Sequence, residues 1–288
     1  MFEAKILLDS ISESAKRLTT MEITFPRIIL AEFNTHRAFS RNSASSRAIP
    51  IAKMIQKVKD DPFIPTYWGA NQKGMQANDE INALDRGFAK DTWLAHRDEA
   101  IASVESLIEL NIHKQLANRL LEPWLWHTVI VTATDWSNFF GTVEANGLRD
   151  NPMAQPEMQR IASMMKTIYY GEHHIQLLKD DEWHMPLMPD INDLKFAYTK
   201  DEIKNISVAR CARVSYLTHD KIRDVQSDLT LHERLISAPH LSPFEHVALP
   251  IAKDCDPNRY IGNFLGWMQY RKFIYDEADF SAKRRNDS

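Results

Sequence analysis

Four segments in which β-branched and apolar residues are bracketed by polar ones predict strands. They are residues 3–8 (EAKILL), 19–25 (TTMEITF), 127–134 (HTVIVTAT) and 244–251 (FEHVALPI).

Apolar residues recur at a spacing near 3.6 from Asp91 to about Leu121, which predicts one long helix or two consecutive ones. Further helices are predicted at 154–169, 202–215 and 224–237, and a brief helix is predicted between Pro26 and about Arg37. Residues 38–49 show neither a helical nor a strand period, so we expect a polar loop there. No repeat or clean linker divides the chain, and the pattern favours one α/β domain over residues 1–288 with a helical excursion at about 60–125.

The composition excludes several classes of function. The 288 residues include only eight glycines, and none stands in a GxGxxG or P-loop pattern, which argues against a Rossmann-type dinucleotide fold or a P-loop. The two cysteines, Cys211 and Cys255, have no zinc-binding spacing and form no disulfide framework. Because no leader or long apolar run is visible, we expect a cytoplasmic protein without membrane contact.

The charge distribution is uneven. A net charge of −4 argues against a general nucleic-acid binder. No carboxylate stands between Glu32 and Asp60, however, and this stretch carries six cations: Arg37, Arg41, Arg47, Lys53, Lys57 and Lys59. A cluster of this kind favours a small anionic ligand over a polymer.

Residues 35–47 carry the strongest candidate chemistry. Arginine forks match phosphate and carboxylate oxygens, and the serine and asparagine side chains of this segment add neutral donors. A solvated basic loop would have the same composition, so composition alone leaves both interpretations open.

The same segment resembles the signature of the flavin-dependent thymidylate synthases, RHRxxSxNxxSxR. The matched positions are His36, Arg37, Ser40, Asn42, Ser45 and Arg47. Three further segments resemble the family's LRxxxxAQxE, AARVSY and HxSPFEH stretches, at residues 148–157, 212–216 and 240–246. The resemblance implies an α/β fold built as a single mixed-sheet domain.

The order of these segments differs from that of the family. There the AARVSY and HxSPFEH stretches precede the signature, whereas here they follow it, as a circular permutation would produce. Under a permutation, the strand at 244–251 is expected beside the strand at 19–25.

The resemblance implies an enzyme, a transferase that methylates dUMP at C5 to give dTMP. The family takes the carbon from 5,10-methylenetetrahydrofolate and reducing equivalents from NADPH through bound FAD, and it implies a homotetramer. Two alternatives stay open. One is hydroxymethylation of dUMP or dCMP with the same cofactors, and the other is a non-catalytic nucleotide-binding relative.

The resemblance also assigns roles to individual residues. It implies dUMP binding by Glu32, Ser45, Arg47 and Arg149, with catalytic roles for Ser45 and Arg149. It implies flavin contacts for His36, Arg37, Asn42, Asn138 and Ser242. No metal site is expected, because the eleven histidines show no metal-binding spacing.

Some residues depart from the family or allow a second interpretation. Thr35 replaces an arginine, Ser43 a frequent glutamate and Glu32 a glutamine, and these changes bear on flavin binding and on the product. Cys211 lies on a predicted helix and is interpreted as a buried structural thiol. Residues 263–272 fit either a packed amphipathic helix or an aromatic platform for flavin or folate.

Overall fold

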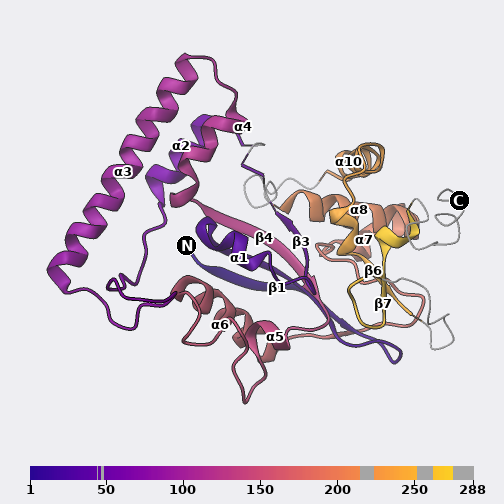
Figure 1. Cartoon of the computed structure of the whole chain (residues 1–288). Helices are drawn as coiled ribbons and strands as arrows, with labels where there is room; N and C mark the ends of the chain where they lie inside the picture. Colours follow the sequence, from indigo (N-terminus) through magenta and orange to yellow (C-terminus); the bar gives the residue numbers. More distant parts are fainter. Residues whose placement is uncertain (44, 47–48, 215–223, 252–261, 275–288) are drawn as a thin grey trace, which may run out of the picture.

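A computed structural model describes residues 1–43, 45–46, 49–214, 224–251 and 262–274 of the chain (Figure 1). Its centre is a five-stranded sheet with the strand order β3-β4-β2-β1-β5. The strands are β1 (Glu3–Ile11), β2 (Leu18–Pro26), β3 (Ser40–Ser43), β4 (Trp126–Ala133) and β5 (Gln176–Leu177). Four of them pair antiparallel, and β5 runs parallel to β1. The expected α/β class with a mixed sheet is therefore confirmed, as are the strands expected at 3–8, 19–25 and 127–134.

The period of two along β2 and β4 gives the sheet two unlike faces. The apolar face consists of buried Met21, Ile23, Phe25, Val129, Val131 and Ala133, and it packs against α6 (Pro156–Tyr170). The opposite face carries threonines, whose hydroxyls bond in pairs across the strands at 2.8 Å (Thr20–Thr132) and 2.9 Å (Thr24–Thr128). Burial of each large apolar side chain stabilises the fold by roughly 1.5–3 kcal/mol.

The helical excursion is a layer with its own apolar cluster. It comprises α2 (Ile51–Asp60), α3 (Ala83–Glu109), α4 (Lys114–Ala117) and the 3-10 helix η2 (Asn118–Trp124). Met54, Val58, Val104 and Leu121 are buried together between these helices. The helix expected from Asp91 begins earlier, at Ala83. The helix α2 was not anticipated, although Ile51, Met54, Ile55 and Val58 follow a helical period.

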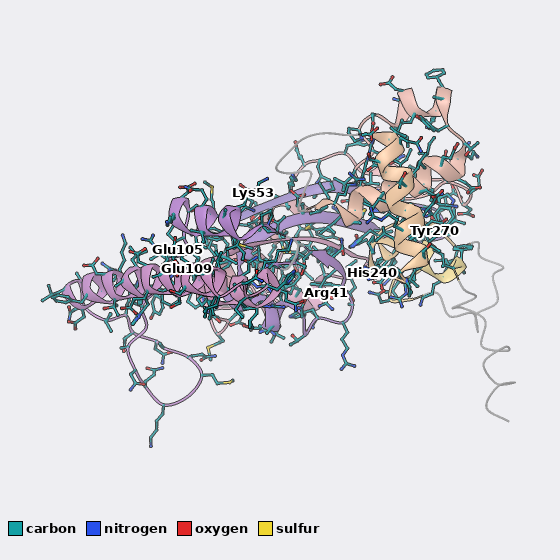
Figure 2. All side chains as sticks on the ribbon, turned by 90° about the horizontal axis from the view of Figure 1, so that it is seen from above. Arg41, Lys53, Glu105, Glu109, His240 and Tyr270 are labelled. Atoms are coloured by element: carbon teal, nitrogen blue, oxygen red, sulfur yellow. The ribbon has the colours of Figure 1, made fainter. Side chains whose placement is uncertain are left out.

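The C-terminal part covers one end of the polar face. Its elements are α7 (Ile191–Ala197), α8 (Lys200–Ala212), α10 (Val225–Ser237), η3 (Ser242–Glu245), β6 (Ala248–Pro250), β7 (Trp267–Gln269) and η4 (Tyr270–Phe273). Seen from above, Glu105 and Glu109 on α3 lie to one side of Arg41, and Tyr270 lies to the other side (Figure 2).

Three expectations of local structure are wrong. The strand expected beside 19–25 is β6, but β6 pairs with β7 in a separate two-stranded sheet. β2 already lies between β1 and β4, so it has no free edge, and Ala248 only packs near Leu18. Strand adjacency therefore gives the permuted order no support.

The other two corrections concern polar segments. Part of the loop expected at 38–49 is β3, because the backbone of Ser40–Ser43 pairs with the exposed edge of β4. One of the two interpretations of residues 263–272, a packed amphipathic helix, is also wrong, because these residues include the short strand β7 followed by η4.

Candidate functional site

The turn between α1 (Leu30–Phe33) and β3 is held from both sides. Phe33 and Phe39 are buried, and both pack against Phe139 of α5 (Ser137–Phe140). On the other side, Arg41 Nη1 donates to the carbonyl oxygens of Phe33 at 3.3 Å and His36 at 3.1 Å. The last residues of α1 and this turn therefore place Glu32, Thr35 and His36 next to one another, where all three contact Arg149.

Arg149 joins this turn from 113 positions away in the sequence. Its Nε donates to His36 Nε2 at 2.8 Å, its Nη1 forms an ion pair with Glu32, and its Nη2 reaches Thr35 Oγ1 at 3.3 Å. The Arg149 backbone N–H donates to the Phe139 carbonyl at 2.8 Å, so the same ring packing also anchors the segment that carries Arg149.

In the group formed by Glu32, Thr35, His36 and Arg149, one negative and one positive charge lie side by side. Burial, followed by the charges of Arg149 and Arg41, lowers the pKa of His36 to about 4, so its ring is neutral at pH 7. Since Nε2 accepts from Arg149, the ring proton sits on Nδ1. The Arg149 charge is offset by Glu32, and the side chains retain 15% and 31% exposure. The group therefore offers a carboxylate acceptor and guanidinium donors side by side.

A second group of expected residues meets at β3. Asn42 Nδ2 donates to the Cys211 carbonyl oxygen at 2.9 Å, and Ser242 Oγ donates to Asn42 Oδ1 at 3.3 Å. These two bonds fix the amide orientation and join positions 169 and 200 residues apart. Ser40, also in the signature, accepts from Gln269 Nε2 at 2.8 Å. Asn42 and Ser242, both expected to contact flavin, are thus brought together.

Of the remaining expected residues, three are exposed and one lies outside the described part of the chain. Arg37 and Ser45 are exposed. Asn138 is exposed on α5, next to the Phe139 ring that packs against His36. Arg47 lies outside the described residues, as do Ser215 and Tyr216 of the ARVSY segment. Their roles, like those of the other site residues, stay predictions.

The described cations of the stretch from Arg37 to Lys59 lie on separate elements of the fold. Lys53 on α2 lies well away from Arg41 (Figure 2), and Lys59 pairs loosely with Glu105 of α3 at 3.9 Å. A pocket of about 410 Å³ opens at the far end of the sheet's polar face, near Glu22, Lys57 and Trp126. Its lining includes none of the predicted site residues.

The donor set near β3 fits a flavin. An isoalloxazine ring presents carbonyl and N–H groups, which match the amide of Asn42 and the hydroxyl of Ser242, while Arg37 supplies an exposed cation for a pyrophosphate. Among the described residues, no group of three or more His, Cys, Asp or Glu side chains is arranged to hold a metal ion.

Arg210, the residue before Cys211, was not among the residues expected from the sequence to belong to the site. Its guanidinium is fully buried and paired with Asp190 and Asp228. An available signal was its spacing from buried Ile203, Ile206 and Ser207, which places an arginine on the inward side of a helix.

Comparisons with known proteins find only distant similarity. No protein-family model matches the chain, and no curated protein matches it. Solved structures similar to it include the UMP/dUMP methylase PolB from Streptomyces cacaoi bound with 5-Br UMP, at 12% identity and a TM-score of 0.45 over 59% of this chain and 88% of that one. The same methylase bound with 5-Br dUMP has 11% identity and a TM-score of 0.45 over 59% and 90%. Likeness at this level decides nothing about activity.

Within the described part of the chain, no helix combines the length and the apolar character needed to cross a bilayer.

Proposed function

We propose that the chain is a flavin-dependent enzyme that transfers one carbon to C5 of a pyrimidine nucleotide, with methylation of dUMP to dTMP as the first candidate reaction. The observation that carries this proposal is the convergence of the family-like segments on one loop. Residues of the signature contact Arg149 at one end of the loop and Cys211 and Ser242 at the other. A solvated basic loop would not gather these partners.

At the nucleotide end, the Arg149–Glu32 pair suits the edge of a pyrimidine ring. A uracil presents an N–H between two carbonyl oxygens, so Glu32 accepts from the N–H while Arg149 donates to a carbonyl. Neutral His36 holds the guanidinium in place through Nε2. Because Glu32 already offsets the charge of Arg149, we expect other cations to bind the nucleotide phosphate, and Arg47 is the first candidate.

At the flavin end, Asn42, Ser242 and Arg37 would hold the cofactor. A bound flavin supplies hydride and carbon-transfer chemistry that no side chain here provides. The chain contributes orientation through the fixed amide of Asn42. Cys211 is buried and burial raises its pKa, so it does not act as a nucleophile toward the pyrimidine ring. The proposal includes NADPH as reductant, 5,10-methylenetetrahydrofolate as carbon donor and a homotetramer.

Hydroxymethylation of dUMP or dCMP is the second candidate, and Thr35 favours it. Thr35 is exposed beside Arg149, where the family has a longer arginine. A shorter side chain leaves room for water, which competes with hydride for the transferred carbon.

Anaerobic flavin spectroscopy tests the proposal. Protein reconstituted with FAD is expected to show a flavin spectrum, to bleach with NADPH, and to recover colour by methylation only when methylenetetrahydrofolate and dUMP are both added. Capture of the transferred carbon by water consumes no hydride, so hydroxymethylation would leave the flavin bleached. Arg149→Ala is expected to bleach normally and to lose the nucleotide-dependent recovery. A protein that binds no flavin would overturn the proposal and support a non-catalytic relative.

A further inference from the structure

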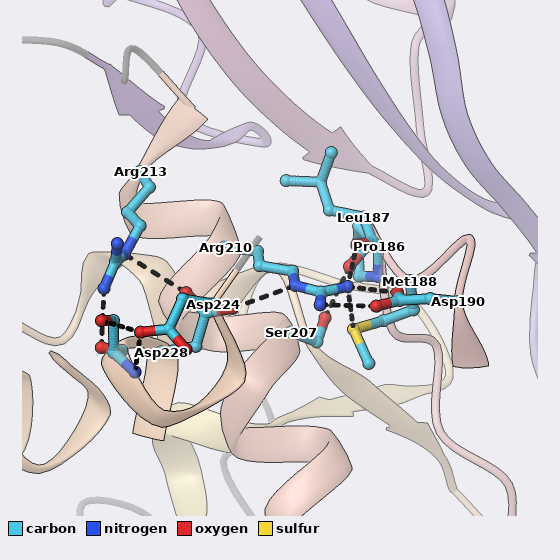
Figure 3. A network of polar contacts seen from close by, with 10 residues as sticks. Pro186, Leu187, Met188, Asp190, Ser207, Arg210, Arg213, Asp224 and Asp228 are labelled. Carbon is cyan, nitrogen blue, oxygen red and sulfur yellow. Dashed lines mark hydrogen bonds and ion pairs between the residues drawn. The ribbon is translucent and has the colours of Figure 1, made fainter. Parts of the chain in front are cut away.

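Arg210, the residue before Cys211, lies at the centre of a cluster of ion pairs and hydrogen bonds that joins α8 to Asp190 and Asp228 (Figure 3). Arg210 of α8 is 0% exposed. Its Nη1 and Nη2 donate to the two carboxylate oxygens of Asp190, and its Nε donates to Asp228 Oδ2 at 3.1 Å. Asp228 also pairs with Arg213 at 3.2 Å. A forked arginine pair of this kind fixes direction as well as distance.

The cluster also fixes the segment that precedes α7. Arg210 Nη1 donates to the carbonyl oxygen of Leu187 at 3.1 Å, and Ser207 Oγ donates to that of Pro186 at 2.7 Å. Leu187 has a φ of +63°, a conformation that a leucine rarely adopts without external support. Two turns of α8 are therefore clamped to residues 186–190.

The next residue along the helix connects this clamp to the site. Cys211 lies in the last turn of α8, where backbone carbonyls have no partner within the helix. Its carbonyl oxygen accepts from Asn42 Nδ2, and Asn42 Oδ1 accepts from Ser242 Oγ. The Cys211 side chain is buried against Ile130 of the sheet, so the helix end is held on both sides.

We infer that the Arg210–Asp190–Asp228 cluster is a positioning device for the cofactor-contacting residues Asn42 and Ser242. The cluster fixes the position of the C-terminal end of α8. The Cys211 carbonyl at this end then orients the Asn42 amide, and the amide orients the Ser242 hydroxyl. The inference rests on the proposed function, because the ligand oriented in this way is the flavin. Arg210 acts through Asn42 and is not itself a catalytic residue.

Asp190→Asn is the variant that probes the clamp. It replaces an acceptor oxygen facing Arg210 with an amide, which breaks the fork, while Asp228, shared with Arg213, remains as a counter-ion. The Asp190 side chain is 31% exposed, so water can reach its end of the lost contact, and we expect the variant to fold. The matched control is Asp201→Asn on the first turn of the same helix, where Asp201 is 84% exposed and pairs with Lys204.

Flavin affinity is measured by fluorescence titration in a double-mutant cycle with Asn42→Ala. Asp190→Asn is expected to weaken FAD binding about five- to tenfold, the scale of one lost hydrogen bond, and to have no effect once Asn42 is alanine. Asp190→Glu is expected to restore most of the affinity, and Asp201→Asn to change nothing. An unchanged affinity, or an equal loss in the Asn42→Ala background, would overturn the inference.

A flavin-free readout separates this inference from the proposed function. The side-chain amide resonances of Asn42, assigned by their loss in Asn42→Ala, are expected to shift in Asp190→Asn but not in Asp201→Asn. If the wild-type protein binds no FAD, the proposed function fails. If the Asn42 resonances do not shift in Asp190→Asn, the cluster does not position Asn42, and the inference is wrong whichever ligand the site binds.

Discussion

Replacing Arg149 with alanine tests the nucleotide end of the site. The guanidinium contacts Glu32, His36 and Thr35, so its removal leaves a partly buried carboxylate without a counter-ion and His36 Nε2 without a donor. Loss of the nearby positive charge also lets the pKa of His36 rise from about 4 toward its ordinary value, although burial still holds it down.

The magnitude follows from the bonds that a bound nucleotide loses. A hydrogen bond to a charged group contributes about 1.5–3 kcal/mol, and each 1.4 kcal/mol or so is a factor of ten in affinity. One such bond lost to Arg149→Ala therefore weakens dUMP binding by about tenfold to a hundredfold. The uncompensated Glu32 carboxylate also repels an anionic nucleotide. Adding Glu32→Gln to the Arg149→Ala variant is therefore expected to raise its dUMP affinity a few-fold.

Isothermal titration calorimetry with dUMP measures the effect on folded protein. Arg86→Ala is the matched control, because Arg86 also forms an ion pair, with Glu80, but sits at the start of α3 with its side chain 46% exposed. The control is expected to bind dUMP normally, and FAD content is expected to fall less than nucleotide affinity in Arg149→Ala. Affinity within threefold of wild type in Arg149→Ala would refute the assigned role.

Three further predictions concern stability and reactivity. Burial lowers the pKa of His184 and of His246 to about 3, so below the ordinary value of about 6.5 the unfolded chain binds more protons. Stability is therefore complete above pH 6.5 and falls as the pH drops toward 3, by roughly 2–3 kcal/mol per histidine at pH 4.5. Urea midpoints at pH 7.5 and 4.5 check this, and equal midpoints would contradict it. Met21→Ala, at a 0% exposed core position, is expected to cost about 2–5 kcal/mol, whereas Ile28→Ala at 41% exposure stays within about 0.5 kcal/mol; urea unfolding compares them. In a Cys255→Ser variant, buried Cys211 is expected to resist Ellman's reagent until urea unfolds the chain, and rapid native labelling would count against its burial.

Local periodicity predicted the centre of the fold well. β2 and β4 alternate apolar and polar residues, and α6 follows a 3.6-residue period, because each has one face against the same core. β3 was missed for a physical reason. Ser40–Ser43 carry no apolar period, and their extended form comes from pairing with the free edge of β4.

The candidate site could be predicted only in part. The motif resemblance pointed to Asn42 and Ser242 separately, but their contact depends on how η3 packs against β3. The Glu32–Arg149 and Arg210–Asp190 ion pairs were likewise outside the reach of local patterns, since they join positions 117 and 20 residues apart. Long-range ion pairs leave no period in a sequence.

Mass analysis of the nucleotide product tests the central claim most directly. The FAD-loaded protein is incubated with dUMP, 5,10-methylenetetrahydrofolate and NADPH in oxygen-18 water, with dCMP in a parallel reaction. The account predicts a flavin-dependent one-carbon product, with unlabelled dTMP as the main species from dUMP. Labelled 5-hydroxymethyl-dUMP or 5-hydroxymethyl-dCMP would keep the reaction class and reverse the order of the two candidates. Recovery of both nucleotides unchanged by flavin-loaded, folded protein would contradict the account.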